Sequence, residues 1–155
     1  MKKIISLTLV FVLTLAFASC GKKEPECITS LDKIYNKIAE TVSMDYEKIE
    51  LTKDDMLDYY GIDSAKIEEL TAVQDACGYK DEIVMIKAAD EASAQEIASL
   101  LTEHIEYQKE SMRNYDAAQF EVLNGSKVDI KGVWVAMFVS SSQDKMLEIY
   151  NSYFA

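Results

Sequence analysis

The sequence predicts an α+β domain built on a four-stranded, mostly antiparallel sheet. Two blocks of similar design support this prediction, since each has two β-rich runs, a short glycine-containing connection and a helical pattern after them. A separate helical segment precedes both blocks. The inner runs Ile83–Ile86 and Val133–Val139 are apolar throughout, which is typical of strands covered on both faces. We expect the two block helices on one face, and the N-terminal helix or a second copy of the chain on the other.

The first 19 residues have the pattern of an export signal. Two lysines precede the apolar run Ile4–Phe17, and Ala18-Ser19 comes directly before Cys20. The alternative is an uncleaved spanning helix, but crossing a bilayer takes about 20 apolar residues and this run is shorter. We interpret residues 1–19 as a lipoprotein signal peptide and Cys20 as the lipidated residue. The chain is then exported and anchored by lipid to the outer face of the cell membrane.

Residues 20–26 are expected to form a lipidated tether that reaches at most about 20 Å when extended. Residues 27–155 have the length of one domain with its own core. The signal holds two of the 16 basic residues and none of the 27 acidic ones, so the remaining chain carries a formal charge of −13. Such a charge opposes binding to nucleic acid and to anionic lipid. Membrane attachment therefore has to come from acyl chains.

The helical segment before the blocks is predicted from one apolar face, formed by Ile28, Leu31, Ile34, Tyr35, Ile38 and Val42. A second, shorter helix should begin at Thr52, whose hydroxyl can cap the first turn, and end at Gly61, which suits a left-handed stop. Both helices precede the sheet in the chain.

The four strands of the blocks are expected at Thr71–Cys77, Glu82–Ala88, Ser126–Ile130 and Val133–Val139. The block helices are expected at Glu91–Arg113, capped by Asp90, and from Ser141 or Ser142 through Phe154. A short helix over Asp116–Leu123 should connect the blocks. The run Lys127–Lys131 alternates between polar and apolar residues, as an edge strand would.

The segment from Tyr60 to Phe154 resembles one bacterial family. The resemblance is carried in order by Tyr60-Gly61-Ile62-Asp63, Asp81–Lys87, a helix ending near Gln108, Tyr115 with Gln119, and Lys131-Gly132 before an apolar strand. It is similar to the small exported lipoproteins, common in Gram-positive clostridia, that carry domain of unknown function 4358. The resemblance implies an extracytoplasmic lipoprotein of unknown activity, and it brings no assigned catalytic or binding residue.

Four polar residues at element ends are candidates to line one cleft: Glu82, Gln108, Tyr115 and Gln119. In the plainer alternative, Gln108 and Tyr115 hydrogen-bond the connection between two helices, and Glu82 faces solvent. Outside the cytoplasm, Cys27 and Cys77 are also candidates for one disulfide. Their alternative is a pair of free thiols, one near the tether and one on a strand.

The sequence predicts no metal site, cofactor or nucleophile. His104 has no Cys or His at ligand spacing, so a partly solvated helix histidine is expected. The acids between Asp54 and Glu69 lack the pattern of a calcium loop. We expect a non-catalytic binding or interaction module at the cell envelope, whose partner is a protein or a small molecule. The alternatives are a hydrolase of cell-wall material with an unrecognised carboxylate pair, and a structural homodimer.

Overall fold

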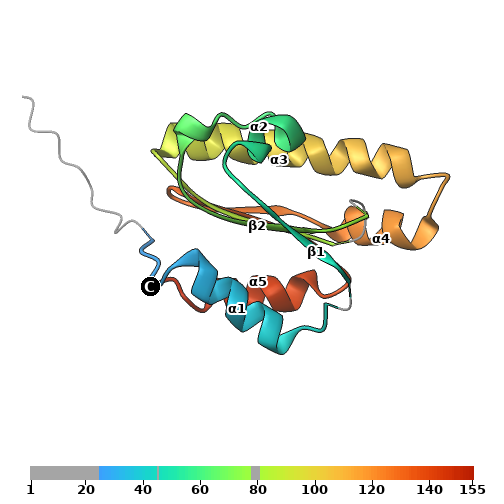
Figure 1. Ribbon diagram of the computed structural model, residues 1–155, viewed down its shortest axis with the longest axis horizontal. Coiled ribbons are helices and arrows are strands. Elements are labelled where there is room, and N and C mark those ends of the chain that lie inside the picture. Colours follow the sequence, from blue (N-terminus) through green and yellow to red (C-terminus); the bar gives the residue numbers. More distant parts are fainter. Residues whose placement is uncertain (1–24, 45, 78–80) are drawn as a thin grey trace, which may run out of the picture.

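The computed structural model describes residues 25–44, 46–77 and 81–155. The expected signal peptide, Cys20 and most of the tether lie outside these residues. The described part is an α+β fold in which one sheet lies between two layers of helices (Figure 1). Within it, no helix has the length and apolar character that a membrane span requires.

The sheet has five strands, all antiparallel, in the order β1-β2-β3-β5-β4. They are β1 (Lys48–Leu51), β2 (Ile67–Asp75), β3 (Glu82–Ala88), β4 (Val128–Lys131) and β5 (Trp134–Val139). The helices are α1 (Leu31–Thr41), α2 (Asp55–Tyr60), the short 3-10 helix η1 (Ser64–Lys66), α3 (Glu91–Met112), α4 (Ala117–Gly125) and α5 (Gln143–Asn151).

The prediction of four strands was wrong because it missed β1. This strand has four residues, and only Leu51 among them is buried, so it lacks the apolar alternation that marks a strand. The chain also begins β2 at Ile67, earlier than predicted, and ends it at Asp75. The other three predicted strands are confirmed within about two residues.

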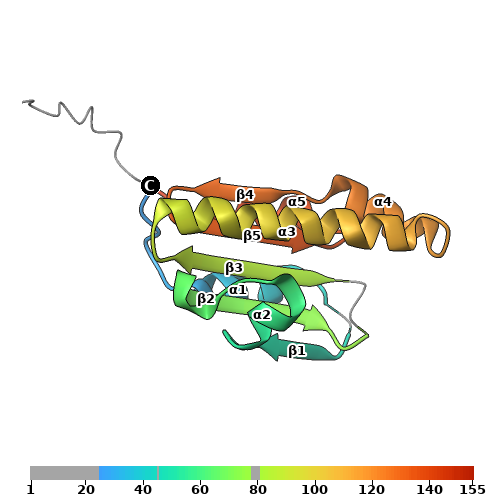
Figure 2. The same ribbon diagram turned by 90° about the horizontal axis from the view of Figure 1, so that it is seen from above.

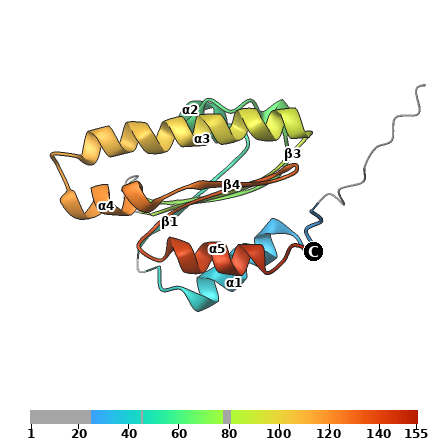
Figure 3. The same ribbon diagram turned by 180° about the vertical axis from the view of Figure 1, so that it is seen from behind.

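The prediction that both block helices share one face was also wrong. Ile97 and Leu101 of α3 pack on one face of the sheet, whereas Met146 and Tyr150 of α5 pack on the other. The α1 helix lies beside α5 and covers that second face, as expected for the N-terminal helix (Figure 3). The physical reason is that the apolar inner strands need a helical layer on each side.

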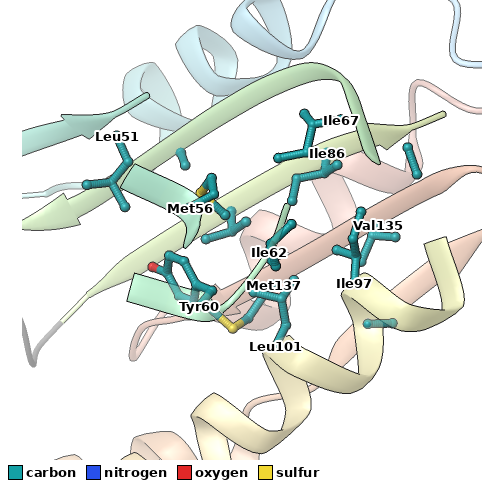
Figure 4. Packing of buried hydrophobic residues seen from close by; sticks show 14 of the residues in the cluster. Leu51, Met56, Tyr60, Ile62, Ile67, Ile86, Ile97, Leu101, Val135 and Met137 are labelled. Carbon is teal, nitrogen blue, oxygen red and sulfur yellow. The ribbon is translucent and has the colours of Figure 1, made fainter. Parts of the chain in front are cut away.

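The central strands β3 and β5 connect the two cores. Along β5, Val135 and Met137 point to α3, while Trp134, Ala136 and Phe138 point to α1 and α5. Figure 4 shows Ile97, Leu101, Val135 and Met137 packed together in the first core. Met56 and Tyr60 of α2 belong to the same core, so α2 extends the layer formed by α3.

Side-chain caps fix the helix ends that the sequence predicted. Asp90 accepts a hydrogen bond from the backbone N–H of Ser93 at 2.7 Å at the start of α3. Asp116 accepts from the N–H groups of Ala118 and Gln119 at the start of α4. Gly61 ends α2 with φ of 70°, the left-handed conformation that glycine adopts without strain.

The two ends of the described chain meet beside the sheet (Figure 2). Cys27 forms an isolated β-bridge with Phe154, and the N–H of Ile28 donates to the carbonyl oxygen of Tyr153 at 3.0 Å. The N–H of Ala155 also donates to the carbonyl oxygen of Glu26 at 3.3 Å, so the backbone from Glu26 to Ile28 is held against the C-terminal residues.

Candidate functional site

A buried carboxylate lies at the first residue of β3. Glu82 is only 2% exposed, and its side chain points to the layer formed by α2 and α3. The Tyr60 hydroxyl donates to its Oε2 at 3.3 Å, and Nε2 of His104 lies 3.0 Å from the same oxygen. The side-chain amide of Gln108 donates to Oε1. A buried carboxylate requires such donors, because an unpaired charge in the core is very costly.

Three elements bring this Tyr60–Glu82–His104–Gln108 cluster together. His104 and Gln108 are four residues apart on α3, so they lie on one face of that helix. Tyr60 is the last residue of α2, and its ring centroid lies 4.6 Å from that of His104. Burial, and then the negative charge of Glu82, raise the pKa of Tyr60 well above its usual range. The phenol therefore stays protonated and remains a donor.

The cluster has the residue types of an acid–base site, but its burial keeps a substrate from reaching it. Glu82 and Tyr60 are buried in the core, and His104 keeps only 18% of its side chain exposed. Both carboxylate oxygens already accept hydrogen bonds within the protein. We interpret the cluster as the polar connection between β3, α2 and α3.

The structure brings together two of the four predicted cleft residues. Glu82 and Gln108 are in contact, and the expectation that Glu82 faces solvent was wrong. Tyr115 is 78% exposed after the end of α3, and Gln119 is buried on α4. Sequence analysis missed Tyr60 and the role of His104. The spacing of His104 and Gln108 was a usable signal, because it places both residues over one point of the sheet.

A surface groove lies between α1 and the strands β1 and β2. Its volume is about 300 Å³, at the lower end of the range typical of small-molecule pockets. From α1, Asp32, Tyr35 and Asn36 line it, and from the strands Glu50 and Thr71 do. This groove is therefore walled by regular secondary structure on two sides.

Hydrogen-bonding groups dominate the groove. The Thr71 hydroxyl donates to Oδ1 of Asp32 at 2.6 Å, which fixes that carboxylate against the sheet. The neighbouring Glu69 on β2 accepts from the N–H of Leu31 at 2.8 Å and so caps α1, since Ser30 makes no side-chain cap. These two contacts hold α1 at its distance from the strands. With Asp32 and Glu50, the groove carries two carboxylates and favours ligands with positive charge or hydrogen-bond donors.

A second hollow, of about 570 Å³, lies where the tether enters the domain. Cys27, Lys87 and Trp134 are among its lining residues, together with Pro25 and Glu26. Pro25 and Glu26 precede the first helix, so part of this wall is irregular chain. The groove beside α1 is lined only by residues of α1, β1 and β2.

The structure leaves both candidate disulfide cysteines free. Cys27 lies by the end of β3 that carries Lys87, whereas Cys77 follows the opposite end of β2, next to the start of β3. A disulfide needs Cα atoms within about 7 Å, so the structure agrees with the alternative of two free thiols. Cys77 is also exposed after β2 rather than part of the strand.

Among the described residues, no three His, Cys, Asp or Glu side chains are grouped so that they could hold a metal ion. Among the acids of α2, Asp55 is held by hydrogen bonds to Thr52. Asp55 accepts from the hydroxyl and the N–H of Thr52 at 2.6 and 2.7 Å, and these hydrogen bonds hold the pKa of Asp55 below its usual value.

One comparison with known proteins found a match. A family model described as "Domain of unknown function (DUF4358)" matches residues 40–140, which is more than half of the sequence. The match extends from the end of α1 to the end of β5 and includes the Tyr60–Glu82–His104–Gln108 cluster. No curated protein and no solved structure shows significant similarity to the chain.

Proposed function

The chain belongs to the family defined by domain of unknown function DUF4358, and we propose that it is an exported, lipid-anchored binding module of the cell envelope. The groove between α1 and β1–β2 is its ligand site. The ligand is a small envelope molecule, or an extended part of an envelope protein, that carries amines or hydroxyls. In this proposal the protein binds its ligand without changing it.

The anchoring half of the proposal is supported by the sequence around Cys20 and by where the fold begins. The apolar run before Ala18-Ser19-Cys20 has the pattern of a lipoprotein signal. The chain joins the fold at Glu26 to Ile28, whose backbone bonds the C-terminal residues. A tether of about six residues reaches no more than about 20 Å, so the domain would stay close to the membrane surface.

The groove is the single observation that carries the binding half. It places Asp32 and Glu50 in one hollow, together with the Thr71 hydroxyl and the Asn36 amide. Carboxylates attract ammonium groups and accept from hydroxyls, and they repel phosphate and carboxylate ligands. The formal charge of −11 over the whole chain acts in the same direction. A basic or hydroxyl-rich ligand therefore fits better than an anionic one.

The same two carboxylates make a cell-wall hydrolase the second candidate. Glycoside hydrolysis uses a pair of acids that flank the bond to be cut. Of the acids discussed above, Asp32 and Glu50 share an open groove, whereas Glu82 is buried with its oxygens occupied. The third alternative is a homodimer that forms through the second face of the sheet. The structure disfavours it, because α1 and α5 already cover that face.

Thermal unfolding of the full-length lipidated chain in detergent micelles tests the binding proposal. The probes are trilysine, triglutamate and a soluble disaccharide-peptide fragment of cell wall. A ligand at 100 times its Kd stabilises the folded state by about 2.7 kcal/mol, which is a readily measured rise in Tm. We expect trilysine or the cell-wall fragment to raise Tm, and triglutamate to leave it unchanged.

Variants locate the site. Asp32→Asn and Glu50→Gln should each remove the rise in Tm, whereas Glu103→Gln, an exposed acid on α3, should keep it. A rise that persists in both groove variants places the ligand elsewhere. Mass spectrometry of the cell-wall fragment after incubation separates the two candidates, since a cleaved product that depends on Asp32 or Glu50 supports the hydrolase.

A further inference from the structure

The strand β1 has one unpaired edge. It stands at the end of the sheet order and pairs with β2 on its inner side, and Figure 2 shows it as the outermost strand. Such an edge exposes backbone donors and acceptors in a row, and it is a template for another strand. Its side chains determine which strand fits.

Hydrogen bonds of the neighbouring strand show which backbone groups face outward. The N–H of Ala76 donates to the carbonyl oxygen of Glu47 at 2.8 Å, so residue 47 bonds toward β2. In an antiparallel pair, successive residues alternate between bonding inward and outward. Ile49 and Leu51 therefore bond toward β2, and the backbone groups of Lys48 and Glu50 point to the free edge.

The side chains of β1 also alternate between the two faces. Leu51 packs in the core formed with α2 and α3, whereas Glu50 lines the groove beside α1. Ile49 therefore lies on the α2 face with Leu51, and Lys48 lies on the α1 face with Glu50. Ile49 is 39% exposed, which is unusual for an isoleucine on a strand.

This arrangement is complementary to itself. If a second copy of β1 pairs antiparallel with residue 49 opposite residue 49, each Lys48 lies opposite Glu50 of the other copy. The outward backbone groups of Lys48 and Glu50 then form the hydrogen-bonded pairs, and the two Ile49 side chains meet on the other face. A two-fold register centred on Lys48 or on Glu50 would instead place like charges opposite each other.

The charges of β1 are available for such pairing. Within the described part of the chain, neither Lys48 nor Glu50 makes an ion pair. At the other edge of the sheet, Lys131 and Asp129 of β4 already pair with each other in the same strand. The observed charges therefore favour β1 over β4 as the self-associating edge.

We propose that two copies of the chain pair through β1, with Ile49 opposite Ile49, and form one continuous sheet across the dimer. The α2 helix packs on the same face of the sheet and carries the exposed apolar residues Leu57 and Tyr59. The contact is small, so it depends on high local concentration. Here the inference rests on the proposed anchoring, because confinement of both copies to one membrane raises their effective concentration.

Disulfide trapping in native membranes tests the register. The full-length Ile49→Cys chain carries Cys77→Ser as well, because Cys77 is exposed. The matched control is Ile130→Cys on the β4 edge, where the wild-type isoleucine is 37% exposed. After mild oxidation, we expect a dimer on non-reducing gels from Ile49→Cys and far less from Ile130→Cys. No dimer from Ile49→Cys, or equal dimer from both, overturns the proposal.

Charge reversal in the Ile49→Cys background tests the side-chain pairing. Glu50→Lys alone and Lys48→Glu alone should each reduce the trapped dimer several-fold, and the two changes together should restore it. If net charge alone controlled association, the result would be the opposite. Glu50→Lys lowers the net negative charge of both copies and would then increase the trapped dimer. An increase with Glu50→Lys, or no recovery in the double variant, contradicts the paired edge.

Failure of anchoring and failure of pairing give different results. A Cys20→Ser chain released from the membrane should lose the trapped dimer at low concentration and regain it when concentrated. If it never regains the dimer, the edge pairing is wrong whatever anchors the chain. If it forms the dimer equally well at low concentration, membrane confinement plays no part in assembly.

Discussion

Nε2 of His104 lies 3.0 Å from Oε2 of Glu82, and this contact connects the middle of α3 to the first residue of β3. The carboxylate is buried, and its remaining donors come from Tyr60 and Gln108. A polar group in this position stabilises the fold only while its partners are present. The cluster is thus a point at which a single substitution should have a large effect.

Replacement of His104 by alanine should lower the free energy of unfolding by about 2–4 kcal/mol. The substitution leaves Glu82 buried with one donor fewer and removes the ring that packs at a tilt against Tyr60. Urea unfolding of the wild type and the variant measures the difference. The control is Glu103→Ala, the preceding residue on α3, which is exposed and should change stability by less than about 0.5 kcal/mol. A loss for His104→Ala as small as that of the control would mean that the contact contributes little.

Replacement of Glu69 by alanine should cost about 1 kcal/mol, because its carboxylate caps the N-terminus of α1 from a strand 38 residues away. The adjacent Glu68 is the matched control. It forms a largely exposed ion pair with Lys87, so Glu68→Ala should cost little. Both values come from chemical denaturation under the same conditions. Equal losses for the two glutamates would contradict the capping role.

The stability contributed by Asp90 should disappear in acid. The N–H of Ser93 bonds its carboxylate and holds the pKa of Asp90 below the usual value of about 3.9. A lowered pKa in the folded state stabilises the protein above the unfolded pKa, and this contribution is lost as the pH falls through the folded pKa. The stability of the wild type relative to Asp90→Asn should therefore decrease between about pH 6 and pH 2. Acids shared by both proteins cancel in this comparison, so a constant difference would exclude the effect.

The two cysteines of the domain should react with iodoacetamide at different rates. Cys77 is exposed, whereas burial raises the pKa of Cys27, and its thiol donates to the carbonyl oxygen of Thr29 at 3.1 Å. Since the thiolate is the reactive form, Cys27 should be alkylated more slowly at neutral pH. Peptide mapping after timed alkylation measures both rates. A peptide that contains Cys27 disulfide-bonded to Cys77 of the same chain would contradict the structure.

Local signals in the sequence predicted most of the fold. The cap at Asp90 and the left-handed Gly61 follow from the chemistry of single residues, and the structure has both. The apolar inner strands correctly indicated a sheet covered on both faces. These features depend on residues close together in the chain, which is why sequence patterns reveal them.

Features that depend on distant residues were missed. The strand β1 exists because β2 supplies its partners, and its own residues are mostly exposed. The face on which α5 packs depends on the position of α1, more than 100 residues earlier in the chain. The contact between Glu82 and His104 spans 22 residues, and neither residue alone indicates burial. Sequence analysis accordingly identified Glu82 and Gln108 but not the cluster that they form.

Mass spectrometry of the N-terminal peptide from the membrane fraction tests the central claim most directly. If the chain is a lipid-anchored envelope module, the mature protein begins at Cys20 and that peptide carries the mass of attached acyl groups. Cys20→Ser should abolish the acylated peptide and release the protein from membranes. An unmodified Cys20 in the wild type, or a chain that still begins at Met1, would contradict the account.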